Sequence, residues 1–191
     1  MPPYSRDTIK KFLRKADRAK TDDAKGEALE DLVEHLFAPV PGIALVRRNL
    51  MSVFRSEELD MVLHNVWHPQ GLTSLNLFIP VECKSCLHPI SGRDLDWFIS
   101  KIRRRTLDMG ILVASHGITG DAAELTAAHD IAASALKDGI RLVVITRRDI
   151  EKLTSTEELV TLIQTRLCDL VIYFYCIGPR LRHKQFDRMC L

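Results

Sequence analysis

The sequence has few cysteines and lacks a long apolar segment, and both absences restrict the kind of protein it encodes. Its five cysteines are an odd number in a chain of 191 residues, and residues 1–15 contain no uninterrupted apolar stretch of the secretory type. No run reaches the roughly 20 apolar residues of a membrane span, since Asp169 interrupts the nearest candidate, residues 167–177. We therefore expect a cytoplasmic protein with neither a disulfide framework nor a membrane segment.

The chain also has little net charge. Its 27 Lys and Arg residues against 25 Asp and Glu give +2, so a surface for nucleic acid would have to come from local clusters. Basic residues do cluster in three places; each cluster alone is compatible with a solvated face, but three together favour a polyanionic partner. The clusters are Lys10, Lys11, Arg14, Lys15, Arg18 and Lys20; Lys101 with Arg103 to Arg105; and Arg180, Arg182, His183, Lys184 and Arg188.

The composition is that of an ordinary globular protein, with 46% hydrophobic and 27% charged residues, enough to build a core. We expect a basic N-terminal helical extension over residues 1–20 and a core over residues 21–155. A C-terminal helix, strand and basic tail are expected over residues 156–191.

Two helices are expected near the N-terminus, a basic one over about residues 6–20 and a second from Asp22 to Phe37. Thr21 to Asp23 separate them and offer capping side chains. In the second helix, apolar residues recur every three or four positions. At about 100° per residue, Glu30 falls at the edge of this apolar stripe, nearer to the core than the other acids. The stripe consists of Leu29, Leu32, Val33, Leu36 and Phe37.

Three extended stretches rich in Val, Leu, Ile and Phe follow, and a meander is their simplest connection. They are residues 43–49, 59–65 and 75–85. Two later apolar runs, GILVAS (residues 110–115) and RLVVIT (residues 141–146), are typical of strands buried on both faces. The apolar VIYFYCI, residues 171–177, predicts one further strand.

Helices are expected around these later strands. Asp121 and Glu124 form the capping box of an Ala-rich helix that ends at Gly139. The other expected helices are residues 94–107, 148–153 and 156–167. The order of elements predicts an α/β protein with a mixed central sheet and helices on both of its faces.

The segment VECKSC contains two overlapping patterns, C-x-x-C (Cys83, Cys86) and E-x-K (Glu82, Lys84). Alternate side chains of a strand share a face, so Glu82 and Lys84 point one way while Cys83 points the other. Cys83 and Cys86 then have opposite parity, and no second cysteine pair offers zinc a complete site. A redox or zinc role for the cysteines is the less favoured alternative.

The E-x-K pattern gains support from Asp60, which alternates with Leu59, Met61 and Leu63 on an otherwise apolar strand. If its strand lies beside that of Glu82, two carboxylates and Lys84 meet at one end of the sheet. Two buried acids are costly unless a cation neutralises them. A divalent ion with oxygen ligands does so, and it also activates water and polarises a phosphoryl oxygen.

Four segments together resemble the PD-(D/E)xK nuclease superfamily, and within it the Mrr-like type IV restriction endonucleases. They are GEALE (residues 26–30), Leu59 with Asp60, VECK (residues 81–84), and GILVASHGITGDAAE (residues 110–124) followed by RLVVIT. The resemblance spans roughly residues 26–153. It implies a restriction-endonuclease-like three-layer α/β/α sandwich with an αβββαβ core.

The resemblance also implies the roles of individual residues. Asp60 and Glu82 would bind Mg2+ or Mn2+ together with the main-chain carbonyl of Cys83, and Lys84 would serve the attacking water. Glu30 would support the metal site or hold a second ion. The basic cluster of Lys101, Arg103, Arg104 and Arg105 would bind nucleic acid.

The expected function is a metal-dependent DNA endonuclease of restriction, defence or repair, a homodimer if it cuts both strands. No nucleotide cofactor is expected, because Gly117 and Gly120 lack the G-x-G-x-x-G spacing. The alternative is a catalytically inactive nuclease-fold module that binds nucleic acid or a protein partner. It is motivated by the segment before Asp60, which reads SEEL where the Mrr-like proteins usually have a glycine-rich segment.

Overall fold

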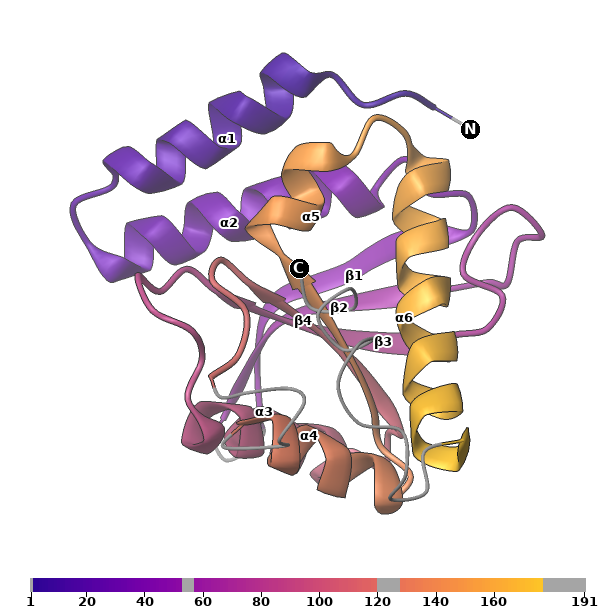
Figure 1. Cartoon of the computed structure of the whole chain (residues 1–191). Coiled ribbons are helices and arrows are strands. Elements are labelled where there is room, and N and C mark those ends of the chain that lie inside the picture. Colours follow the sequence, from indigo (N-terminus) through magenta and orange to yellow (C-terminus); the bar gives the residue numbers. More distant parts are fainter. Residues whose placement is uncertain (1, 53–56, 120–127, 177–191) are drawn as a thin grey trace.

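The computed structural model describes residues 2–52, 57–119 and 128–176, which build a five-stranded mixed sheet (Figure 1). The spatial order is β1-β2-β3-β4-β5; the first three strands are antiparallel neighbours and the last three are parallel neighbours. The strands are β1 Ile43–Met51, β2 Glu58–Asn65, β3 Phe78–Lys84, β4 Met109–Ala114 and β5 Arg141–Thr146. The predicted meander and mixed sheet are confirmed.

Helices cover both faces of this sheet, as predicted (Figure 1). One face carries α1 Arg6–Arg18, α2 Asp22–Phe37, α5 Arg147–Lys152 and α6 Thr156–Cys176, and the other carries α3 Gly92–Arg104 and α4 Ala128–Lys137. Strand β4 is buried on both sides, with Ile111 and Val113 in the core beneath α2 and α6 and Leu112 and Ala114 in the core beneath α3. No helix within the described ranges is both long and apolar enough to cross a membrane.

The break between α1 and α2 follows from their caps. Thr21 accepts a hydrogen bond from the backbone N–H of Ala24 and begins α2, as the sequence predicts. The two helices then pack against each other, with the apolar side of α1 buried at Ile9, Leu13 and Ala16. Glu30 lies at the edge of the buried side of α2, its side chain 13% exposed, which confirms its predicted position.

Pro80 fits the sheet because the parallel pairing of β3 with β4 begins only after it, at Val81 and Ile111. Proline has no N–H to donate to a ladder. On the neighbouring strand, Gly110 lets α3 approach β4 closely. A Cβ atom at this position would lie 2.5 Å from Ile102 Cδ1 and 2.9 Å from Phe98 Cζ. The close packing of α3 brings its side chains within reach of β3.

One predicted element is wrong. The expected strand over residues 171–177 is helical at least as far as Cys176, because α6 continues through this apolar run. A short apolar run does not by itself distinguish a buried strand from a buried helix. The predicted capping box of Asp121 and Glu124 and the basic cluster from Arg180 to Arg188 lie outside the described residues.

Candidate functional site

The candidate site lies where the pairing of β2 with β3 ends. Their register pairs Met61 with Val81, so the next opposed residues are Asp60 and Glu82. Asp60 Oδ2 accepts a hydrogen bond of 2.7 Å from the backbone N–H of Cys83. The Asp60 carboxylate therefore accepts the Cys83 N–H in place of a backbone carbonyl of β2. The structure thus brings Asp60 close to Glu82 and Lys84, as predicted.

Glu82 is buried, with 1% of the residue exposed, and two lysines bind its carboxylate. Lys84 Nζ lies 2.9 Å from Glu82 Oε1, so the two side chains share a face of β3 as strand parity predicts. Lys101 Nζ, from α3, lies 2.8 Å from both carboxylate oxygens. Such charge-assisted hydrogen bonds are what a buried carboxylate requires.

The prediction that Lys101 lies with the arginines on the outer face of α3 is wrong. Lys101 is 5% exposed and points toward the sheet. The reason is helical geometry: Lys101 follows Phe98 by three positions, which sets it beside the buried stripe. The pairing of Lys101 with Glu82 is a contact between elements, for which the three-residue spacing from the buried Phe98 is the one sequence signal.

Asp60 has a different electrostatic setting. Burial, followed by the charge of Glu82, raises the pKa of Asp60 from 3.8 to about 6, against the opposing effects of the Cys83 N–H and Lys84. For Lys84, burial favours the neutral form, but the charges of Glu82 and Asp60 outweigh it and raise the pKa of the ammonium group. Lys84 is therefore a cation whose side chain is still 34% exposed at the end of the sheet.

Glu30 is held by Arg48 of β1, a residue that is not part of the predicted site. Arg48 Nη2 lies 3.0 Å from Glu30 Oε2, and its Nη1 lies 2.8 Å from Asp31 Oδ1 and 3.2 Å from Glu34 Oε2. Burial raises the pKa of Glu30, while Arg48 acts in the opposite direction. The charge of Glu30 also helps to raise the pKa of Asp60, which places Glu30 in the electrostatic surroundings of the site.

The two cysteines of VECKSC are free and lie in different environments. Cys83 is buried in the core beneath α2, where burial raises the pKa of its thiol, and Cys86 is exposed. The N–H and C=O of a strand residue point to the same neighbouring strand. Since the N–H of Cys83 faces Asp60, its carbonyl oxygen faces that side too.

The oxygen atoms at this end of the sheet are of the types that bind a hard divalent cation. Carboxylates of Asp60 and Glu82 and the carbonyl of Cys83 are ligand types that Mg2+ and Mn2+ prefer. Within residues 2–52, 57–119 and 128–176, no group of three or more His, Cys, Asp or Glu side chains is arranged to hold a metal. The candidate site offers only two such side chains, Asp60 and Glu82, beside the Cys83 carbonyl. An ion bound to Glu82 would also have to compete with Lys84 and Lys101 for its carboxylate.

The predicted basic cluster of α3 is largely paired with acids. Arg103 lies 2.7 Å from Asp138, while Arg104 and Arg105 both bind Glu57, at 3.3 and 2.8 Å. Arg104 also stacks over the ring of Trp97. Arg103 and Arg104 are exposed at the C-terminal end of α3, whereas Arg105 is only partly exposed.

Comparison of the chain with protein-family models and with the sequences of curated proteins gives no match.

Proposed function

We propose that this protein is a metal-dependent endonuclease that hydrolyses phosphodiester bonds of DNA, with a restriction-endonuclease-like fold. The observation that carries the proposal is the meeting of Asp60, Glu82 and Lys84 at one end of β2 and β3. A carboxylate with a raised pKa, beside a second acid and a lysine, is typical of functional sites. The order of α2, the β1–β2–β3 meander, α3 and β4 further supports the proposal.

In the proposed mechanism, Asp60, Glu82 and the carbonyl of Cys83 would hold Mg2+ or Mn2+. The ion would lower the pKa of a bound water and polarise a phosphoryl oxygen. Lys84 is positioned by Glu82 and keeps its positive charge, so it can orient the attacking water or stabilise the charge that develops on the phosphate.

Two other residues support this arrangement in the proposal. Lys101 holds Glu82 from α3 and fixes the orientation of its carboxylate before substrate binds. Arg48 holds Glu30 at the edge of α2 and limits the negative charge around Asp60. Cutting both strands of a duplex would require two copies of the site, which a homodimer supplies.

The test is a cleavage assay on supercoiled and linear DNA with Mg2+ or Mn2+, comparing the wild type with Asp60→Ala and Lys84→Ala. We expect cleavage by the wild type and a loss of about 100-fold or more in each variant. Lys137→Ala, at an exposed position of α4, is the matched control and should cleave like the wild type. Equal cleavage by all four proteins would refute the assignment of the site.

A second candidate is a nuclease-fold module that binds nucleic acid or a protein partner without cutting. The observation that favours it is the neutralisation of Glu82 by Lys84 and Lys101, which satisfies the carboxylate with the chain's own cations. DNA binding that is independent of divalent cations, with no cleavage under any of them, would support this candidate. Cleavage that depends on Asp60 would exclude it.

A further inference from the structure

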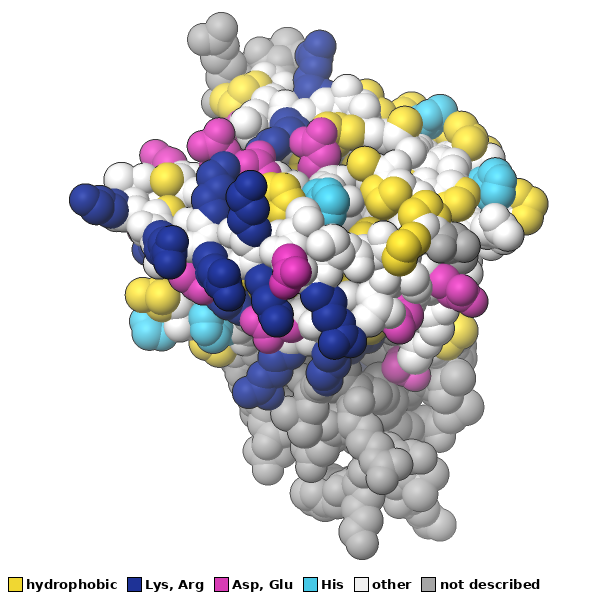
Figure 2. All heavy atoms as spheres, turned by 90° about the horizontal axis from the view of Figure 1, so that it is seen from above, with side chains coloured by type: hydrophobic (Ala, Val, Ile, Leu, Met, Phe, Trp, Pro, Cys, Tyr) yellow, Lys and Arg dark blue, Asp and Glu magenta, His cyan; other side chains and the backbone are white. Residues whose placement is uncertain are grey.

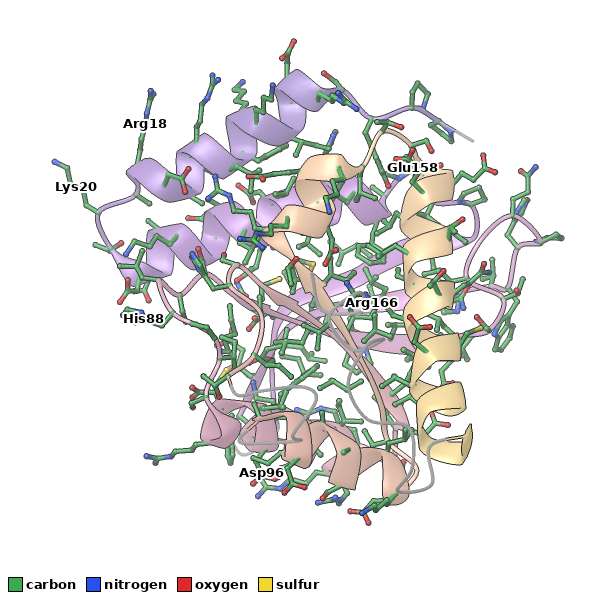
Figure 3. The ribbon with its side chains drawn as sticks, viewed as in Figure 1. Arg18, Lys20, His88, Asp96, Glu158 and Arg166 are labelled. Carbon is green, nitrogen blue, oxygen red and sulfur yellow. The ribbon has the colours of Figure 1, made fainter. Side chains whose placement is uncertain are left out.

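Helix α1 presents a continuous basic face to solvent. Its buried residues, Ile9, Leu13 and Ala16, lie on one side, and the exposed cations recur every three or four positions on the other. These cations, called the α1 basic face below, are Lys10, Lys11, Arg14, Lys15 and Arg18. Figure 2 shows Lys and Arg side chains gathered in a row on this side of the molecule, and Figure 3 shows Arg18 projecting away from the helix.

Most of this face has no acidic partner in the part of the chain that the structure describes. Lys15 binds Asp31 at 2.7 Å, but the side chains of Lys10, Lys11, Arg14 and Arg18 make no ion pair or hydrogen bond with any described residue. Like charges three or four positions apart on a helix repel each other. The α3 arginines, in contrast, are each matched with Asp138 or Glu57. The α1 basic face therefore carries uncompensated positive charge that an external anion would relieve.

A chain of ion pairs connects this face with the surroundings of the candidate site. Lys15 binds Asp31, Asp31 binds Arg48 at 2.8 Å, and Arg48 binds Glu30 at 3.0 Å. In Figure 3, Arg18 and Lys20 lie on the same side of the molecule as His88, which belongs to the connection between β3 and α3. A long, rigid polyanion that reaches the end of β3 can thus also contact the C-terminal half of α1.

The chemistry of the face fits the phosphate backbone of a duplex. At about 1.5 Å per residue, Lys11 to Arg18 span roughly 10 Å, and duplex DNA carries one negative charge per about 1.7 Å of its axis. The one aromatic residue of α1, Phe12, lies against His35 of α2 with ring centroids 5.4 Å apart, so it is not presented for base stacking. Contacts would be to phosphates and independent of base sequence.

An anionic membrane is the less suitable partner. A helix that lies in a membrane interface buries its apolar face in lipid. Here the apolar face of α1 already packs on α2, with Ile9 and Leu13 in the same core as Leu32 and Leu36. Only the charged face is available to a partner.

We infer that the α1 basic face binds the phosphate backbone of duplex DNA and holds the substrate against the candidate site. The choice of DNA rests on the proposed function. The binding itself requires neither a divalent ion nor cleavage, so it can be measured separately.

The experiment measures binding of a fluorescent 30-base-pair duplex in EDTA by anisotropy, over a series of salt concentrations, using the full chain. The test variant is Lys11→Gln/Arg14→Gln/Arg18→Gln. The matched control, Arg47→Gln/Lys137→Gln/Arg141→Gln, removes the same charge from positions on β1, α4 and β5 that lie outside the α1 basic face and outside the basic cluster of α3. Thermal unfolding establishes that both variants fold.

We expect the negative slope of log K against log salt to become less negative by about 3 in the test variant, because each phosphate contact contributes about −0.9 to the slope. The affinity at ~0.1 M salt should be at least tenfold weaker. The control should keep the wild-type slope within about 1. A slope in the test variant that stays within about 1 of the wild type, or an equal change of slope in both variants, overturns the inference. So does tighter binding to phosphatidylglycerol vesicles or to duplex RNA than to DNA.

The inference and the proposed function fail in different ways. If the wild type cuts DNA with Mg2+ while the test variant keeps the wild-type slope, the inference is wrong and the endonuclease proposal stands. If the slope becomes less negative as expected but the wild type cleaves DNA with none of the divalent ions tested, the α1 basic face binds DNA and the endonuclease proposal is wrong.

Discussion

Asp60 and Glu82 both lie just past the end of the β2–β3 pairing, where the charge of Glu82 acts on Asp60, yet the surroundings of the two acids are opposite. Glu82 is the more deeply buried, and two lysines bind its carboxylate at 2.8 to 2.9 Å. Asp60 is less buried and receives one backbone hydrogen bond, while burial and the charge of Glu82 raise its pKa to about 6. The charge of Glu82 is therefore neutralised by two lysines, whereas ionised Asp60 stays energetically unfavourable.

This difference identifies Asp60, rather than Glu82, as the acid whose environment points to a functional role. A paired buried acid has a structural explanation, since it anchors α3 to β3 through Lys101. An acid held with a raised pKa destabilises the protein at neutral pH, and such strain is characteristic of sites that bind a cation or transfer a proton. Under the proposed function, Asp60 would be the acid whose charge a metal ion neutralises.

The largest expected effect comes from breaking the Glu82 pair. Lys101→Met leaves Glu82 with Lys84 alone, and we expect the free energy of unfolding at pH 7.5 to fall by about 2 to 3 kcal/mol. Urea unfolding measures it. The double variant Glu82→Gln/Lys101→Met is the control, and it should recover most of the loss because the one charge left without its partner, Lys84, is 34% exposed and not fully buried. A loss below about 1 kcal/mol in Lys101→Met would show that the pair does not anchor α3.

The converse change at Asp60 should stabilise the protein. Because the pKa of Asp60 is raised in the folded state, its charge opposes folding above pH 6 and this cost disappears as the pH falls toward 4. Asp60→Asn should therefore be more stable than the wild type by about 1 to 2 kcal/mol at pH 7.5, with no difference near pH 4. Its amide oxygen can still accept the Cys83 N–H. Urea unfolding at both pH values checks this, and a variant less stable at pH 7.5 would contradict the account.

Mg2+ should stabilise the folded wild type but not the Asp60→Asn variant. At a free concentration about five times its dissociation constant, an ion that binds only the folded protein adds about 1 kcal/mol to stability. Thermal unfolding with Mg2+, compared with the same ionic strength of NaCl, separates binding from screening. Equal stabilisation of both proteins would place the ion elsewhere.

The smallest effect is expected from the arginine two positions beyond Lys101. Arg103 and Asp138 form an ion pair whose side chains are 53% and 61% exposed, so Arg103→Ala should cost less than about 0.5 kcal/mol. Measured beside Lys101→Met, it tests whether burial rather than charge sets the contribution of each cation on α3. A loss as large as that of Lys101→Met would contradict this view.

Much of the fold and of the acidic site could be predicted because both depend on local periodicity. Strand parity places Glu82 and Lys84 together and turns Cys83 into the opposite core. Alternation around Asp60 and the turn-rich segment before β3 favour antiparallel neighbours, which the register confirms. The edge position of Glu30 follows from the apolar stripe of α2.

The contacts that could not be predicted depend on how elements pack. Arg48 reaches α2 from a strand whose pairing is shifted between Leu45 and Arg47, and such a bulge changes which side a residue faces. The burial of Lys101 depends on the close approach of α3 over Gly110. The run at the end of α6 is apolar enough for either a strand or a helix, and in the structure it is the last part of a helix.

The central claim is that Asp60 takes part in hydrolysing DNA, and single-turnover cleavage by Asp60→Asn with Mg2+ or Mn2+ tests it most directly. The variant is expected to be the more stable protein, so a lost activity cannot be attributed to unfolding. We predict that the wild type cleaves and that Asp60→Asn is slower by about 100-fold or more. Cleavage by the variant at the wild-type rate would contradict the account.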